Sequence, residues 1–147
     1  MRKLLFTGFK GKNNASAAVV AALPGAHCLL TNSFGGVKRD IEALPNDCEC
    51  VIMFGVDKTL KDSVRLEKAA ESGGVRLTSF LNLDAWKAFL EAEGLKAEIS
   101  ATPTHYLCNE AYFHALKKFG GKAVFIHIPT LKYTDASFIE KIKLVCR

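Results

Sequence analysis

Two short segments of the chain are apolar at nearly every position, and they constrain the fold more than any other feature. They are residues 50–54 (Cys-Val-Ile-Met-Phe) and 123–128 (Ala-Val-Phe-Ile-His-Ile). A strand that faces solvent on one side alternates polar and apolar residues, whereas a strand covered on both faces does not. The two segments therefore predict central strands of a sheet that is buried between two layers of helices.

The rest of the chain alternates between extended and helical patterns. Further strands are predicted at residues 3–7, 27–31 and 96–100, and helices at 15–22, 37–44, 83–93, 109–119 and 136–145. Strands that alternate with helices predict an α/β protein with a mostly parallel sheet. We expect residues 1–147 to form a single-domain three-layer αβα sandwich.

Glycines set the expected ends of these elements. Gly8 and Gly55 are expected to end the first and third strands, and Gly35-Gly36 is expected to form a turn before a helix. The polar stretch between Gly55 and residue 74 carries no predicted element. Because ligands bind at the carboxyl ends of strands in such sheets, a site is expected near Gly8, Gly55 and His127.

Charge and composition disfavour several classes of function. The net charge is +5, but the lysines are scattered and no aromatic residues are interleaved with them, so no nucleic-acid partner is expected. The apolar run after Lys3 stops at Thr7, which is too short for a signal peptide or an anchor. We therefore expect a cytoplasmic protein without membrane contact. The five cysteines lack zinc-type spacing, so no metal site is predicted, and no glycine-rich phosphate-binding string favours nucleotide binding.

Cys108 lies where an extended segment passes into a predicted helix. Backbone N–H groups and the positive end of the helix dipole favour a thiolate at such a position. The same N–H groups could hold a developing oxyanion. A cysteine between Leu107 and Asn109 is also compatible with an inert core residue, and both interpretations stay open on this evidence.

His127 interrupts an otherwise apolar strand, and a buried imidazole needs a polar partner. It is either a core histidine bonded to the backbone or a base that faces Cys108, with its second ring nitrogen held by a carboxylate. Glu67 is the candidate carboxylate, and the alternative for it is a surface glutamate. His105 could contact a substrate, whereas His114 lies nearly on the opposite face of the helix from the cysteine.

Four segments together resemble the pyroglutamyl peptidase I (pyrrolidone-carboxylate peptidase) family, cysteine peptidases that remove an N-terminal pyroglutamyl residue. The resemblance is carried by residues 5–9 (L-F-T-G-F), 64–69 (V-R-L-E-K-A), 106–109 (Y-L-C-N) and 125–129 (F-I-H-I-P). It implies Cys108 as the nucleophile, His127 as general base and acid, and Glu67 as the residue that orients the histidine. It implies no metal or organic cofactor, and it allows a homo-oligomer, because the family tends to form them.

The chain departs from the family pattern around the substrate pocket, so the resemblance is to a shortened and divergent member. Residues 10–14 replace the P-F-G-G stretch that helps to build the family's lactam pocket. Phe9 and Phe54 are candidates to line such a pocket, although both are also compatible with the core. Arg76 could replace the family's arginine near the oxyanion.

The sequence therefore predicts a cysteine hydrolase that acts on a small peptide or amide through a Cys-His-Glu triad and a thioester intermediate. Removal of an N-terminal pyroglutamyl residue is the activity that the resemblance implies. Two alternatives remain. One is a cysteine amidase on the same scaffold with another small amide substrate. The other is a non-catalytic domain that keeps these residues for packing.

Overall fold

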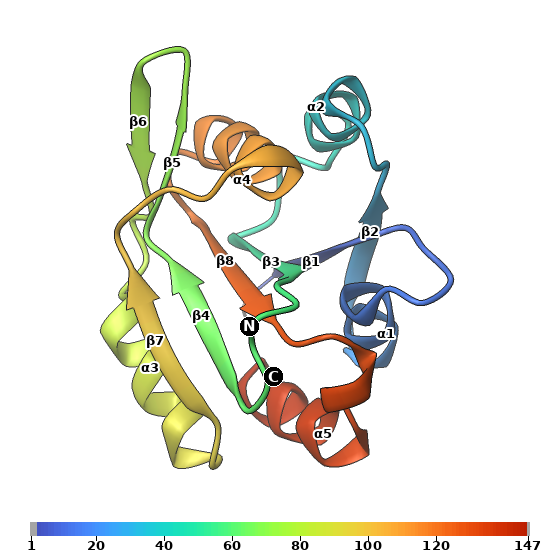
Figure 1. Cartoon of the computed structure of the whole chain (residues 1–147). Helices are drawn as coiled ribbons and strands as arrows, with labels where there is room; N and C mark the ends of the chain where they lie inside the picture. The colour runs from blue at the N-terminus through green and yellow to red at the C-terminus, as the bar shows by residue number, and fades with distance from the viewer. Residues whose placement is uncertain (1–2, 147) are drawn as a thin grey trace.

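A six-stranded sheet forms the centre of the molecule (Figure 1). The computed structural model describes residues 3–146. Its elements, in chain order, are β1 (Leu4–Phe9), α1 (Ala15–Ala22), β2 (Ala26–Leu30), α2 (Phe34–Glu42), β3 (Cys50–Val56), β4 (Ser63–Glu67), β5 (Ala69–Ser72), β6 (Val75–Thr78), α3 (Leu83–Ala92), β7 (Lys96–Ser100), α4 (Tyr106–Lys118), β8 (Ala123–Ile128), a 3-10 turn (Leu131–Tyr133) and α5 (Ala136–Val145). The strand order is β2-β1-β3-β8-β4-β7. The first four run parallel, whereas β4 is antiparallel to β8 and parallel to β7.

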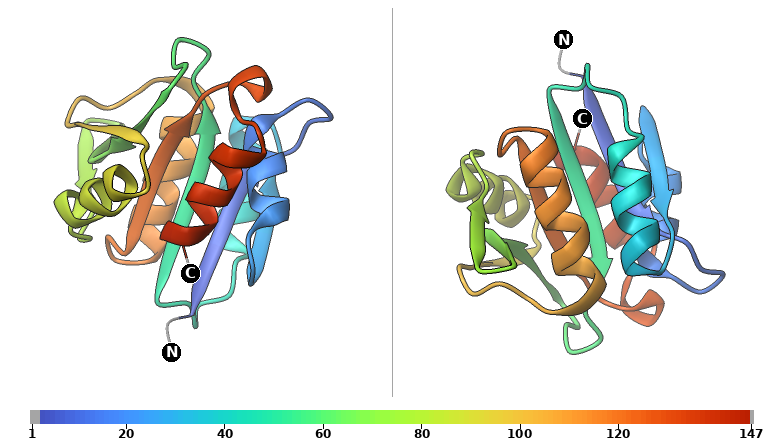
Figure 2. Two further views of the ribbon diagram at one scale, coloured as in Figure 1. Left: turned by 90° about the horizontal axis from the view of Figure 1, so that it is seen from below. Right: turned by 90° about the horizontal axis from the view of Figure 1, so that it is seen from above.

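Helices cover both faces of the sheet (Figure 2). Helices α1, α3 and α5 pack on one face with Ile52 and Phe54 of β3, and α2 and α4 pack on the other with Val51 and Met53. This alternation within one fully buried strand is the reason that β3 is apolar throughout. The predicted α/β class, with a mostly parallel sheet between two helical layers, is confirmed.

The helical segments follow their capping signals closely. Helices α1 and α5 have the predicted bounds, and each begins after a residue whose side chain accepts a backbone hydrogen bond, Asn14 and Asp135 respectively. Within residues 3–146, no helix combines the length and the apolar character needed to span a bilayer.

The glycine boundaries differ from the prediction. Gly8 and Gly55 lie inside β1 and β3 and do not end them. Gly35 and Gly36 lie in the first turn of α2, not in a turn before it, because Ser33 caps the helix by accepting a hydrogen bond from the Gly36 N–H. The sequence predicts a break at each of these glycines, whereas the strand pairing continues through Gly8 and Gly55 and the Ser33 cap starts α2 ahead of Gly35.

Three strands that the sequence did not predict lie in the polar stretch after β3 and directly after it. Strand β4 inserts between β8 and β7, with Val64 and Leu66 in the core under α3 and α5. Strands β5 and β6 form a hairpin beside α4, visible at the upper left of Figure 1. Asn109 of α4 holds this hairpin, because its side chain accepts from the Glu71 N–H at 3.0 Å and donates to the Glu71 carbonyl at 2.8 Å.

Candidate active site

Three neighbouring strands place one row of residues under the start of α4. His127 of β8 pairs with Gly55 of β3 on one side and with Arg65 of β4 on the other. Because side chains alternate along a strand, Arg65, Glu67 and His127 point to the same face of the sheet. The antiparallel register sets Glu67 opposite Phe125, one diagonal step from His127. Glu67 can therefore reach the imidazole.

Glu67 and His127 form a buried pair. The distance from His127 Nδ1 to Glu67 Oε1 is 3.2 Å, and the two side chains are 5% and 2% exposed. The Tyr112 hydroxyl donates to the Glu67 carbonyl at 2.7 Å, which fixes the backbone of the glutamate from α4. Glu67 is not the surface residue of the alternative interpretation. A carboxylate on Nδ1 selects the tautomer in which Nε2 is unprotonated and free to accept a proton.

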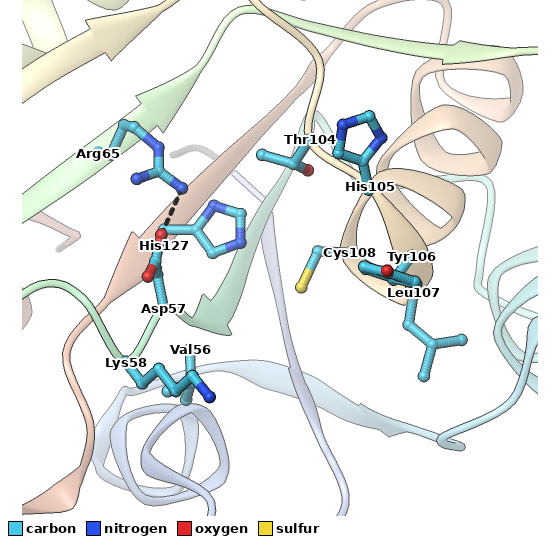
Figure 3. Close-up of a pocket in the computed structure, with 10 residues that line it drawn as sticks. All are labelled: Val56, Asp57, Lys58, Arg65, Thr104, His105, Tyr106, Leu107, Cys108 and His127. Atoms are coloured by element: carbon cyan, nitrogen blue, oxygen red, sulfur yellow. Dashed lines mark ion pairs between the residues drawn. The ribbon is translucent and has the colours of Figure 1, made fainter.

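Cys108 approaches this pair from above the sheet. It lies in the first turn of α4, which begins three residues earlier than predicted, and its thiol is free. Cys108 and His127 line one pocket of about 630 Å³, and Figure 3 shows the sulfur and the imidazole facing one another across it. Among the described residues no hydrogen bond joins these two groups, so they share the pocket without being bonded.

The start of α4 supplies the backbone groups that an oxyanion would need. The first four N–H groups of a helix have no partner within the helix. The residue before the helix, His105, gives them no side-chain cap, and no acidic residue stands in the first turn. Tyr106 has a φ of 66°, a left-handed conformation that is unusual for a residue other than glycine. Such strain is often found at functional sites.

Cys108 does not meet the expectation of a stabilised thiolate. Burial raises the pKa of its thiol to about 12, the carboxylates of Glu67 and Asp57 act in the same direction, and only Arg65 opposes them. The sequence showed the helix start, which favours the thiolate, but it did not show the burial or the two nearby negative charges. Cys108 is therefore a thiol at neutral pH, and it can become a nucleophile only by giving its proton to a base.

We expect alkylation of Cys108 by iodoacetamide to accelerate by about tenfold per pH unit from neutral to mildly alkaline pH, because only the thiolate reacts and the pKa lies above that range. Mass spectrometry of the peptide that contains Cys108 measures the rate. The Cys28→Ser protein is the control. It removes another partly exposed cysteine and should leave the alkylation rate of Cys108 unchanged. A rate that is already constant below about pH 8 would instead reveal a thiolate paired with imidazolium.

Arg65 and Asp57 are site residues that the sequence did not predict. Arg65 Nε donates to Glu67 Oε1 at 2.6 Å, and Arg65 Nη2 lies 2.8 Å from Asp57 Oδ2, the ion pair dashed in Figure 3. Both residues line the pocket. The available signal was the alternation V-R-L-E, in which two charged residues take every second position of a strand whose other face is apolar.

Of the predicted substrate-contact residues, the structure brings only His105 to the pocket. Phe54 faces the opposite layer, because it precedes Gly55 and side chains alternate along β3. Phe9 lies on the same side of the sheet as the pocket, under α2 and α4, but it is 5% exposed and packs in the core near Phe125. Arg76 is exposed on β6 and donates to the carbonyl of Ala101 at 2.6 Å, away from the pocket lining.

The other histidine near Cys108 in sequence lies elsewhere. His114 Nε2 is 2.9 Å from Glu110 Oε1, and His114 lines a separate pocket with residues of α2. Within residues 3–146, no group of three or more histidine, cysteine, aspartate or glutamate side chains is placed to hold a metal ion.

Fold and pocket together define an α/β protein with a cysteine at a helix start above a buried histidine–glutamate pair. No protein-family model and no curated protein matches the chain. Solved structures do match it over nearly their whole length. Pyrrolidone carboxyl peptidase from Thermus thermophilus has a TM-score of 0.82 at 18% identity, over 97% of this chain and 98% of the other.

Two more solved structures have the same fold. Pyroglutamyl peptidase I from Bacillus amyloliquefaciens has a TM-score of 0.82 at 17% identity, over 99% of this chain and 95% of the other. Pyrrolidone carboxyl peptidase from Thermococcus litoralis has a TM-score of 0.77 at 22% identity, over 99% and 92%. The chain therefore has the fold of the pyroglutamyl peptidases, which confirms the resemblance at the level of the fold.

Proposed function

We propose that the protein is a cysteine peptidase that removes an N-terminal pyroglutamyl residue from peptides. The buried Glu67–His127 pair, whose imidazole lines the same pocket as Cys108, carries this proposal. The solved structures that share the fold are named as enzymes of this activity, which supports it. A cytoplasmic location and assembly into a homo-oligomer are further parts of the proposal.

The mechanism begins from a neutral thiol. His127 takes the proton of Cys108 on Nε2 while the sulfur attacks the carbonyl carbon of the scissile amide. Glu67 accepts the hydrogen bond from Nδ1 and stabilises the imidazolium that forms. The N–H groups at the start of α4 donate to the oxyanion of the tetrahedral intermediate.

Three further proton transfers complete the cycle. The imidazolium protonates the leaving amine, the C–N bond breaks and a thioester to Cys108 remains. His127 then takes a proton from water, whose oxygen attacks the thioester, and returns that proton to the departing sulfur. The products are the free peptide amine, the acid and the original thiol. Apart from the substrate and this water, no group outside the chain is needed for the proton balance.

One observation favours a second candidate, a cysteine amidase with a different small amide substrate. Neither Phe9 nor Phe54 lines the pocket, and its wall carries the charged side chains of Asp57 and Lys58. An uncharged lactam ring gains little binding free energy from these charged side chains, whereas a more polar acyl group could form hydrogen bonds with them.

The test is hydrolysis of pyroglutamyl-aminomethylcoumarin, beside a panel of other fluorogenic amides, by the wild type and by Cys108→Ser. We expect the wild type to release coumarin and Cys108→Ser to be slower by about three orders of magnitude or more. Cys28→Ser is the matched control and should retain full activity. Cleavage of only another amide would favour the amidase, and cleavage of none would leave the non-catalytic domain.

A further inference from the structure

A chain of charged contacts leads from the end of β3 to His127, and Arg65 is its central member. Its guanidinium bonds to Glu67 Oε1 through Nε at 2.6 Å and to Asp57 Oδ2 through Nη2 at 2.8 Å. The Arg65 side chain is only 18% exposed. A planar guanidinium with two carboxylate partners has little freedom to rotate, so its position is well defined.

Asp57 is itself fixed by a turn. Its Oδ1 accepts from the Thr59 N–H at 2.9 Å and from the Thr59 hydroxyl at 2.6 Å. Partial burial acts to raise the pKa of Asp57, but the hydrogen bonds from Thr59 and Arg65 outweigh it and lower the pKa to about 2. Asp57 is therefore a carboxylate at neutral pH, and its second oxygen is free to hold Arg65.

The buried carboxylate of Glu67 requires a cation beside it, and Arg65 is that cation. Its side chain is 2% exposed, and within the described residues its Oε2 is buried without a hydrogen-bond partner. The whole hydrogen bonding of this carboxylate falls on Oε1, which Arg65 Nε and His127 Nδ1 share. A buried carboxylate with a neutral imidazole as its one partner would be poorly compensated, and nothing would stop it from turning Oε1 away from the ring.

We propose that Arg65, clamped by Asp57, is a positioning residue that holds the Glu67 carboxylate against His127 Nδ1 and thereby keeps Nε2 directed at Cys108. The effect on catalysis rests on the proposed function, whereas the effect on the histidine tautomer does not. Arg65 touches the glutamate and the aspartate and is assigned no contact with the reacting atoms, so its removal should slow the reaction without weakening substrate binding.

The first arm of the test is kinetic and uses Arg65→Met and Arg65→Lys. We expect Arg65→Met to lower kcat by about 10- to 100-fold with KM changed by less than about threefold, because a charge-assisted hydrogen bond is lost. Arg65→Lys keeps the charge without the planar fork and should recover part of the loss. Asp62→Asn is the control, since it removes an exposed aspartate–lysine pair outside the pocket. It should leave kcat within about twofold.

The second arm is NMR of the imidazole nitrogens of His127 in the Cys108→Ser background. We expect the Nδ1-protonated tautomer with Arg65 present and a shift toward the Nε2-protonated tautomer in Arg65→Met, which a merely structural role would not produce. Asp57→Asn keeps Arg65 and serves if Arg65→Met does not fold. It should give a smaller change in the same direction.

The two arms separate the two proposals. If the wild type cleaves no amide but the His127 tautomer changes with Arg65, the peptidase proposal fails and the positioning role stands. If the tautomer is unchanged in the folded variants and kcat stays within about twofold, Arg65 is not a positioning residue.

Discussion

The His127→Ala variant is expected to lose amide hydrolysis by about three orders of magnitude or more, with its fold retained. Burial keeps the Cys108 thiol protonated at neutral pH, so the sulfur depends on a base more strongly than a preformed thiolate would. Removal of the imidazole also leaves the Glu67 carboxylate, among the described residues, with Arg65 as its hydrogen-bond partner. The measurement is kcat/KM on the best substrate of the amide panel, with circular dichroism to verify folding.

The pocket offers one other histidine, which should not replace it. His105 also lines the pocket, but it is exposed, and its ring lies edge-on to Tyr106 with a centroid distance of 6.4 Å. No carboxylate bond to His105 is found within the described residues. A base without such a partner lacks a fixed tautomer and orientation.

The matched control is His114→Ala. Like His127, His114 lies beside a glutamate, at 2.9 Å from Glu110, but it is only partly buried and lies on α4 away from the pocket that holds Cys108. We expect its kcat/KM to stay within about twofold of the wild type. If His127→Ala keeps more than about a tenth of the wild-type kcat/KM, the assignment of His127 as the base is wrong.

The parts of the fold that the sequence predicted are those with local signals. The apolar runs of β3 and β8 identify buried strands without any knowledge of their neighbours, and capping residues fix where helices such as α1 begin. Strand β4 has only five residues, two of them charged, and was left within a polar stretch. The side chains of Arg65 and Glu67 are drawn inward because they pair with each other, and Glu67 also pairs with His127 on the neighbouring strand. No local sequence pattern shows this pairing across strands.

In the candidate site too, the residues with local sequence motifs could be predicted, whereas the features set by packing could not. Motifs predict Cys108, His127 and Glu67, and the structure places Cys108 and His127 at one pocket with Glu67 buried against the imidazole, but their chemical roles stay predictions. The helix start predicts a lowered pKa for the Cys108 thiol, whereas burial raises it. This burial depends on the sheet beneath the sulfur, which the sequence around Cys108 does not show. Phe54 was expected at the pocket from its place near a strand end, whereas strand parity turns it to the other face.

Gly55 shows how a sequence feature can have a purely spatial cause. It lies inside β3, opposite His127, at the point where Cys108 of α4 and the ring of Phe125 of β8 lie against this strand. A Cβ atom at this position would lie 2.6 Å from Phe125 Cζ and 2.9 Å from Cys108 Sγ. Both distances are shorter than van der Waals contact, so a side chain and the floor of the pocket cannot occupy the same space.

Gly55→Ala should therefore damage stability and catalysis together. Phe125 is 1% exposed and packs between the rings of Tyr112 and His127, at centroid distances of 5.7 and 4.9 Å, so it can move little. We expect the free energy of unfolding to fall by about 1–3 kcal/mol through overpacking. A displaced sulfur should lower kcat/KM by about 100-fold. Urea unfolding and steady-state kinetics measure the two effects.

Gly35→Ala separates this spatial cause from the general effect of adding a methyl group. A Cβ at Gly35 would meet no atom within 4 Å, and the residue lies in the first turn of α2. Alanine there should leave activity unchanged and raise stability by up to about 1 kcal/mol, because it favours helix more than glycine does. If Gly55→Ala behaves like Gly35→Ala in both measurements, then the sulfur of Cys108 does not rest against β3, and the pocket floor described above is wrong.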